Sequence, residues 1–168
     1  CSSDLVAGDT GVLLNNHMDD FSIGIGKGNA YELVGNRVNG IKPGKRPLSS
    51  MSPTFVESEE GVLMLGTPGG SRIISMVILS VLEHLSNLGS DPKNIVALPR
   101  YHHQYLPDRV QIEPESFDQS WISSLEALGH NVQVYRRKWG NMQAIFCDNY
   151  THKCVTLNDP RGKAGVVF

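Results

Sequence analysis

The order of the expected elements places this chain in the α+β class, as an antiparallel sandwich. Strands come first, two helices follow, and after one more strand and one more helix the chain returns to strands. Segregated runs of this kind are typical of antiparallel α+β folds and not of a doubly wound parallel sheet. With 168 residues the chain is long enough to bury a real core, and we expect residues 1–168 to form a single domain.

Apolar periodicity and turn residues define the individual elements. A short apolar run at 11–14 indicates a buried strand, and a later hairpin with its turn at 59–61 leads directly into a helix. Apolar residues at the spacing of one helix face predict a further helix, which Gly129 closes. The predicted elements after the first strand are strands at 55–58 and 62–65, helices at 72–87, 92–98 and 118–128, and strands at 110–113, 131–135, 142–146 and 154–157.

The composition argues against two classes of partner. Lys and Arg number 15 and Asp and Glu number 17, so the net charge is −2 and no basic face indicates nucleic acid. The longest apolar segment, 73–85, is interrupted by Ser75, Ser80, Glu83 and His84. It therefore predicts a buried or amphipathic helix and no membrane insertion by this chain.

The cysteines and paired histidines leave alternatives. Cys147 and Cys154 flank a hairpin turn, and they would either form a disulfide in an oxidising compartment or stay free. We favour free thiols, because opposed cysteines in a hairpin need a favourable register. For His102 and His103 we expect structural hydrogen bonds and no metal site, because adjacent side chains point in different directions and no third ligand has a useful spacing.

The stretch 62–74 joins a strand, a tight turn and a helix. Gly69 and Gly70 let the backbone approach a ligand closely, and the first amides of the helix point outward with partial positive charge. Such amides suit an anion or a developing oxyanion. The alternative is a simple connection in which glycine only relieves crowding.

Two carboxylates and a long loop precede this turn. Asp19 and Asp20 follow the run at 11–14, where they either project into a cleft or cap a solvated turn. The glycine-rich loop of about 22–44 carries Tyr31, either as a lid residue or as an anchoring aromatic.

A serine-rich segment comes next. Ser49 and Ser50 lie between two prolines in a stiff stretch that is poor for a helix. Hydroxyls and amides presented in this way suit a carboxylate or amide ligand.

Several separate stretches together resemble the small subunit of the gamma-glutamyltranspeptidase family, and the resemblance covers essentially the whole chain. The stretches are 13–16 (LLNN), 18–21 (MDDF), 44–54 (GKRPLSSMSPT), 68–73 (PGGSRI), 99–104 (PRYHHQ) and 159–161 (DPR). The resemblance implies an N-terminal nucleophile hydrolase fold, an αββα sandwich of which this chain would be a part.

The resemblance also implies an activity. Members of the family are made as precursors that cleave themselves into large and small subunits. The new N-terminal Thr of the small subunit attacks a gamma-glutamyl amide such as glutathione, and the acyl group passes to water or to an amino acid. Neither a metal nor an organic cofactor is implied.

Carried over position by position, the resemblance assigns site roles. Gly69 and Gly70 would supply oxyanion-hole amides, Ser49 and Ser50 would hold the alpha-carboxylate of the donor, and Asp20 would hold its alpha-ammonium. Donors fixed before charge develops suit a tetrahedral intermediate, and charge-assisted hydrogen bonds orient an amino-acid head group.

Two further positions belong to the same site by resemblance. Tyr31 falls where bacterial members carry the lid-loop tyrosine. His17 stands where the family usually has Glu or Gln against the donor's ammonium, and protonated His would repel that group. We therefore expect weaker donor binding below about pH 6.5, the ordinary pKa of histidine. The difference also leaves room for a relative with another acyl donor.

The nucleophile of the family would lie upstream of Cys1, so this chain is expected to be inactive alone. Cys1 itself is an alternative N-terminal nucleophile, but its position relative to 13–16 argues against that role. The expected partners are the large subunit from the same precursor and a gamma-glutamyl substrate, in the periplasm, outside the cell or at its surface. The rival hypotheses are a binding or scaffold relative that keeps the pocket, and a relative that acts on a cephalosporin side chain or poly-gamma-glutamate.

Overall fold

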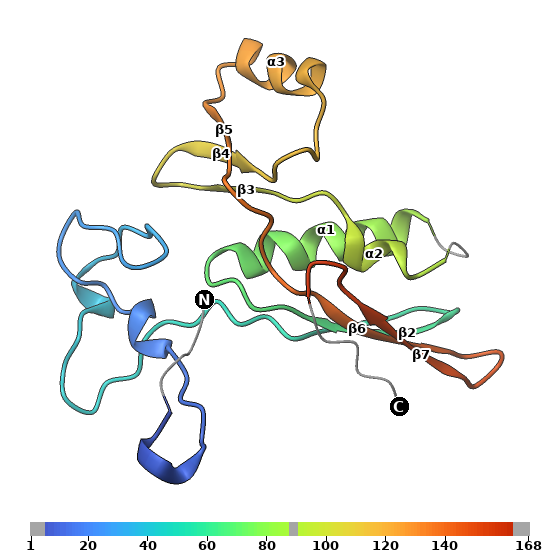
Figure 1. Ribbon diagram of the computed structural model, residues 1–168, viewed down its shortest axis with the longest axis horizontal. Coiled ribbons are helices and arrows are strands. Elements are labelled where there is room, and N and C mark those ends of the chain that lie inside the picture. Colours follow the sequence, from blue (N-terminus) through green and yellow to red (C-terminus); the bar gives the residue numbers. More distant parts are fainter. Residues whose placement is uncertain (1–5, 88–90, 163–168) are drawn as a thin grey trace. The chain divides into compact units, whose positions relative to one another are not determined.

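The computed structural model describes residues 6–87 and 91–162, and Cys1 lies outside this part of the chain. The described residues group into two compact units. Unit 1 holds residues up to Ser50 together with Gln104–Pro107, and unit 2 holds the remainder (Figure 1). Each unit is described by itself, so the expected single domain stays a prediction.

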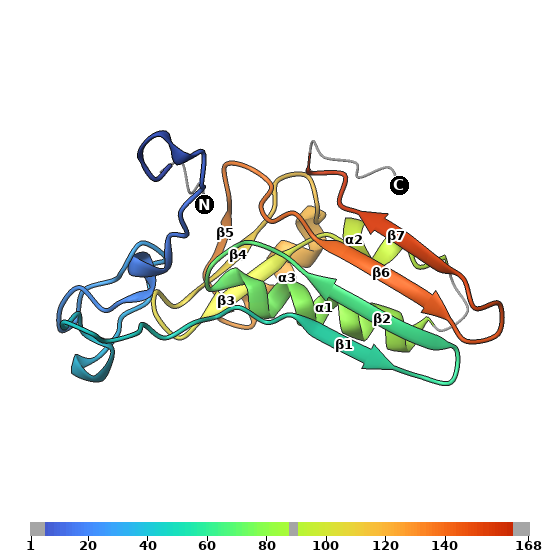
Figure 2. The same cartoon turned by 90° about the horizontal axis from the view of Figure 1, so that it is seen from below.

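An antiparallel sheet forms the base of unit 2. Its strands are β1 (Thr54–Glu57), β2 (Gly61–Gly66), β6 (Gln143–Asp148) and β7 (Cys154–Asn158), in the order β1-β2-β6-β7 (Figure 2). The hairpin predicted before the glycine turn is confirmed, because β1 pairs antiparallel with β2. Strand β2 then pairs antiparallel with β6, and β6 with β7, as expected for an antiparallel α+β fold.

Helix α1 (Arg72–Ser86) lies along one face of this sheet (Figure 2). It buries Ile73, Met76, Val77 and Ser80, the spacing of one helical face, and so confirms the amphipathic helix. Helix α2 (Asn94–Ala97) is shorter than expected, because the residues before it form a turn in which Asp91 Oδ1 accepts from the Lys93 N–H. The core between helices and sheet is made of Leu63, Leu65, Ile73, Met76, Val77, Ile95, Val96, Trp139, Met142, Ala144 and Leu157.

A smaller sheet has the order β3-β4-β5. Its strands are β3 (Tyr101–Gln104), β4 (Arg109–Ile112) and β5 (Val132–Val134), and β3 was not predicted as a strand. Strands β4 and β5 pair in parallel, because helix α3 (Gln119–Ala127) connects them as a crossover. The antiparallel expectation is therefore wrong for this pair. The side chain of Asp118 caps α3 by accepting from the Trp121 N–H at 2.8 Å.

The described part of unit 1 consists of loops with short 3-10 helices, η1 (Gly8–Thr10), η2 (His17–Asp20) and η3 (Arg37–Asn39). The buried strand predicted at 11–14 is wrong. Leu13 forms an isolated bridge with Val6, and the side chains of Val12 and Leu13 are 57% and 63% exposed. One bridge does not bury an extended segment, so apolar residues alone were a poor guide here.

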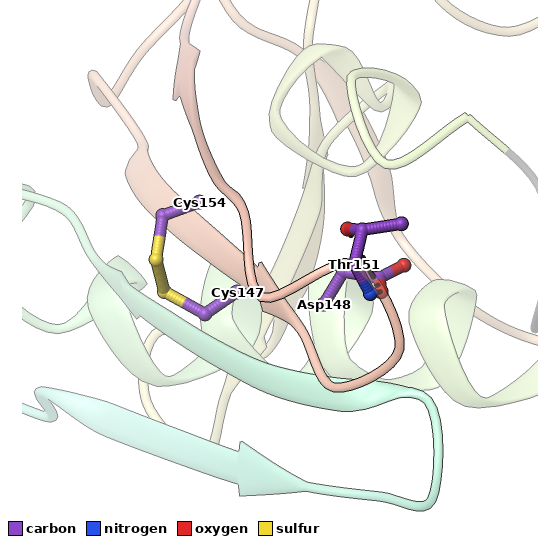
Figure 3. The surroundings of a disulfide bond; sticks show 4 residues. All are labelled: Cys147, Asp148, Thr151 and Cys154. Atoms are coloured by element: carbon purple, nitrogen blue, oxygen red, sulfur yellow. Dashed lines mark hydrogen bonds between the residues drawn. A yellow bond between two sulfur atoms is a disulfide. The ribbon is translucent and has the colours of Figure 1, made fainter.

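The preference for free thiols is also wrong, because Cys147 and Cys154 form a disulfide across the β6–β7 hairpin (Figure 3). The two residues are directly paired in the ladder, with their Cα atoms 4.0 Å apart. The hairpin turn sets this register, since Asp148 Oδ1 accepts from the N–H groups of Tyr150 and Thr151 at 2.8 and 2.6 Å.

Four charged side chains of unit 2 form a network of ion pairs with little exposure to solvent. Arg100 Nη2 lies 2.5 Å from Asp159 Oδ2, and Arg161 Nη2 lies 2.5 Å from Glu113 Oε2. Arg161 also reaches Asp159 Oδ1 at 3.2 Å and so joins the two pairs. Burial raises the pKa of Asp159, but hydrogen bonds from the Arg161 and Met142 amides and the pairing with Arg100 outweigh burial and lower this pKa below its ordinary 3.8.

This network gives a prediction about stability. In Asp159→Asn an amide replaces a carboxylate that accepts from both Arg100 and the Met142 N–H, so a buried cation loses its counter-charge. We expect the free energy of unfolding to fall by about 3–5 kcal/mol in urea titrations followed by tryptophan fluorescence.

The pH dependence and a control belong to the same experiment. Because the folded-state pKa of Asp159 is lowered, its stabilisation is present above pH 3.8 and is lost as the pH falls through the folded pKa. Asp159→Asn removes this acid-sensitive contribution. The control Asp118→Asn changes an exposed cap that asparagine replaces well, and equal losses in the two variants would contradict the prediction.

Candidate functional site

The predicted site residues are divided between the two units. His17, Asp20, Tyr31, Ser49 and Ser50 belong to unit 1. Gly69 and Gly70 belong to unit 2.

The glycine turn of unit 2 requires glycine for two physical reasons. Gly69 and Gly70 have φ angles of 154° and 58°, which L side chains rarely adopt. A Cβ atom on Gly69 would also lie 2.6 Å from Met76 Cε. The carbonyls of these glycines accept from the N–H groups of Arg72 and Ile73, at 3.2 and 3.1 Å, so the turn is fixed to the start of α1.

Arg72 holds the first turn of α1 in place, and the sequence did not indicate how. Its Nε and Nη2 donate to Gln111 Oε1 at 3.1 and 2.6 Å. Its Cζ lies 4.7 Å from the ring centroid of Tyr135 and 5.3 Å from that of Trp139. A guanidinium over aromatic rings is attracted to their faces, so a positive charge is fixed directly after the glycine turn.

Asp20 ends η2 in unit 1, and the two residues that follow it are buried. Phe21 and Ser22 are 2% and 7% exposed and anchor the backbone beside the carboxylate. Burial raises the pKa of Asp20 above 3.8, the charge of His17 lowers it, and Asp19 raises it. His17 is exposed and starts the same short helix that Asp20 ends.

Tyr31 is brought close to Asp20 in unit 1. Its pKa is raised above 10.0, first by burial and then by the negative charge of Asp20. The Tyr31 hydroxyl accepts from Asn16 Nδ2 at 3.1 Å, and its carbonyl accepts from Gln104 Nε2 at 3.2 Å. The loop of 22–44 is therefore held at Tyr31 from two directions, and its role as a lid stays a prediction.

The serine segment is linked to Asp20 through Asn39. Asn39 Nδ2 donates to the Asp20 carbonyl at 2.7 Å, and Asn39 Oδ1 accepts from the Leu48 N–H at 2.8 Å. Ser49 and Ser50 follow Leu48 directly, so the structure brings the segments that carry the predicted carboxylate and hydroxyl groups into one loop cluster.

Sequence reasoning gave no role to Asn16, Asn39, Gln104, Gln111 or Arg72. Each acts through a contact with a residue distant in the chain, and no local spacing indicates such contacts. Asn16, Arg72 and Gln104 lie in the stretches 13–16, 68–73 and 99–104 that resemble the family. This resemblance was the one sequence signal that could have indicated them.

The paired histidines make the structural hydrogen bonds that we predicted. His102 Nδ1 lies 2.7 Å from Ser75 Oγ, and His103 Nε2 lies 2.8 Å from Asp108 Oδ1. Within residues 6–87 and 91–162, no three His, Cys, Asp or Glu side chains are arranged to hold a metal ion. Nor does a helix in these ranges have the length and apolarity needed to cross a membrane.

The cluster around Arg72 gives a second prediction. Arg72→Lys keeps the charge but loses the two-pronged hydrogen bond to Gln111 and the planar stacking. We expect the free energy of unfolding to fall by about 1–2 kcal/mol, measured by urea unfolding. Arg37→Lys, a control at an exposed arginine, is expected to change it by less than about 0.5 kcal/mol. A full-sized loss in the control, or none in Arg72→Lys, would contradict this account.

Comparison with known proteins gives a consistent result. The family model of gamma-glutamyltranspeptidase matches residues 2–168. The chain is 44% identical over 142 residues to a glutathione hydrolase proenzyme of Escherichia coli K12, covering 84% of this chain and 24% of that protein. It is 39% identical over 164 residues to a glutathione hydrolase proenzyme of Pseudomonas aeruginosa, covering 96% and 29%.

A solved structure of a gamma-glutamyltranspeptidase has the same fold as this chain. Gamma-glutamyltranspeptidase from Pseudomonas nitroreducens, complexed with L-DON, superposes with a TM-score of 0.82 at 38% identity, covering 98% of this chain and 86% of that one. The predicted N-terminal nucleophile hydrolase fold is therefore confirmed for this part of the sandwich. The chain spans about a quarter of the length of the curated relatives named above.

Proposed function

Because the chain belongs to the gamma-glutamyltranspeptidase family, we propose that it forms part of an enzyme that transfers gamma-glutamyl groups from glutathione-type amides to water or to an amino acid. The observation that supports this most directly is the loop cluster of unit 1. There a partly buried carboxylate, Asp20, is tied through Asn39 to the segment that carries Ser49 and Ser50. A carboxylate and two hydroxyls complement the two charges of an amino-acid head group.

In this proposal each residue has one task. Asp20 accepts hydrogen bonds from the alpha-ammonium of the donor, while Ser49 and Ser50 donate to its alpha-carboxylate. The N–H groups of Gly69 and Gly70 donate to the carbonyl oxygen as it becomes an oxyanion. Donors that are already fixed in a rigid turn need no reorganisation as this charge develops.

The bond-making group of the proposal is a threonine upstream of this chain. Its hydroxyl attacks the gamma-carbonyl, its own amine accepts the proton, and an ester forms as the amine of the leaving group departs with a proton. Water or an amino acid then cleaves the ester. On this proposal the chain alone is inactive, and the large subunit of the same precursor is its partner.

The location of the enzyme is part of the same proposal. The Cys147–Cys154 disulfide supports a periplasmic, secreted or cell-surface protein, because disulfides persist mainly in oxidising compartments.

One observation favours a second candidate. His17 lies beside Asp20 where a donor's ammonium would bind, and its positive charge would compete with that group. A relative that takes another acyl donor would avoid this competition. The complete protein should therefore be assayed with a gamma-glutamyl anilide, an acyl-beta-lactam and poly-gamma-glutamate, and turnover of the anilide alone would exclude the second candidate.

The oxyanion role gives a direct test. Gly69→Ala in the complete protein places a Cβ against Met76 at a φ angle of 154°, so the amides of the turn must move. We expect kcat for gamma-glutamyl-p-nitroanilide to fall by about 10²–10³-fold with KM little changed. Gly66→Ala is the matched control, because a Cβ there would contact no atom within 4 Å. Equal activity in Gly69→Ala and the wild type would refute the role.

The acidic groups predict a pH profile. The raised pKa of Asp20 means that the carboxylate is lost at a higher pH than an ordinary aspartate as the solution is acidified. We expect kcat/KM to fall on acidification as the Asp20 carboxylate is protonated.

The variant His17→Gln tests the effect of this neighbour on Asp20. The fall in kcat/KM should move to higher pH because the charge that lowers the pKa of Asp20 is gone. An unchanged profile of kcat/KM against pH would contradict the assignment of His17.

A further inference from the structure

Asn39 makes three hydrogen bonds that join separate segments of unit 1. Its Nδ2 donates to the Asp20 carbonyl, its Oδ1 accepts from the Leu48 N–H, and its own carbonyl accepts from the Ser22 N–H at 2.9 Å. We propose that Asn39 is a positioning residue that sets the separation between the ammonium-binding and carboxylate-binding halves of the site. This inference rests on the proposed function, and it adds the residue that makes the site selective for donors carrying both charges.

The amide of Asn39 is fixed before any ligand binds. Asn39 is the last residue of η3, whose start is capped by Asn36 Oδ1 accepting from the Val38 N–H at 2.9 Å. Its neighbour Gly40 bridges to Ser22, a buried residue two positions after Asp20. The main chain of Asn39 is therefore attached to the Asp20 segment, and its side chain reaches from there to the serine segment.

The two side-chain bonds require an amide group of this length. One atom must donate to a carbonyl and the other must accept from an N–H, which a carboxylate, a hydroxyl or an apolar side chain does not do in the same geometry. Both partners are backbone groups, so the Asp20 carboxylate is not used by this contact. Asn39 thus joins the segments without consuming the groups proposed to bind the donor.

A second contact joins nearby parts of the same loops. Lys45 Nζ donates to the Val38 carbonyl, which links the residue before Asn39 to the chain leading into Leu48. Lys45 is on a flexible stem, whereas the short Asn39 side chain makes both of its bonds at 2.7 and 2.8 Å. The separation of the two segments is therefore set mainly at Asn39.

This separation matters only for a ligand that touches both segments. A ligand with an ammonium and a carboxylate on one carbon must satisfy both at once, and a misplacement of about 1 Å costs up to about 10²-fold in such arrangements. A ligand with one of the two charges follows whichever segment binds it. Removing the Asn39 hydrogen bonds should therefore weaken the binding of ligands that carry both charges and leave the binding of ligands with one charge almost unchanged. General destabilisation of the protein would weaken both kinds of ligand.

The test is calorimetric binding to the complete protein with three matched ligands. L-glutamate carries both alpha charges, glutarate lacks the ammonium, and 4-aminobutyrate lacks the alpha-carboxylate. We expect the wild type to prefer L-glutamate over both, and Asn39→Ala to weaken L-glutamate binding by about tenfold or more with the other two changed less than about twofold. Val38→Ala is the matched control, since it shortens a side chain of the same short helix that is 78% exposed and keeps the backbone hydrogen bonds of that residue.

Each outcome decides the inference. It is overturned if Asn39→Ala leaves L-glutamate binding intact, if all three ligands weaken alike, if Val38→Ala has the same effect as Asn39→Ala, or if the wild type does not bind L-glutamate. Turnover of gamma-glutamyl-p-nitroanilide by the wild type is measured separately. If the proteins show the expected binding pattern but the wild type shows no turnover, the proposed function is wrong and the role of Asn39 still holds.

Discussion

Unit 2 depends on the buried pairing of Arg100 with Asp159 and of Arg161 with Glu113. These four side chains come from the start of β3, the end of β4 and the segment after β7, so they join the small sheet to the large one. Charges are costly to bury unless they are paired and hydrogen-bonded. Here the carboxylates also accept from the N–H groups of Trp139 and Met142, which binds the connection between β5 and β6 into the same network.

The network supports the glycine turn through contacts within unit 2. The main chain of Trp139 donates to Glu113 and accepts from Arg100, and its ring lies beside the guanidinium of Arg72. Arg72 in turn donates its N–H to the Gly69 carbonyl. The stretches 99–104 and 159–161, quoted for their resemblance to a family, therefore have a structural task in this chain. Their charged side chains, with Glu113, fix the main chain of Trp139, whose ring lies beside Arg72 at the proposed oxyanion turn.

Unit 1 is organised differently, by side chains that bond to the backbone and not by a large apolar core. Asn29, Asn36 and Asn39 each fix a turn or a crossing of the loops in this way. Short asparagine side chains suit this work because they both donate and accept. The loops can then present Asp20 and the serines at defined positions without helices or strands of any length behind them.

The sequence by itself determined the elements of unit 2 other than β3, and the chemical types of the site. Periodicity located α1, α3 and the large-sheet strands, because burial of one face leaves a repeat in the chain. Glycines at 69 and 70, carboxylates at 19 and 20 and serines at 49 and 50 were visible as residue types. Only the tertiary structure decided the parallel β4–β5 pair, the cysteine register, the exposure of Leu13 and the contacts of Asn39 and Arg72. Each of these features depends on partners distant along the chain. The local sequence does not show which backbone group will lie opposite a given side chain.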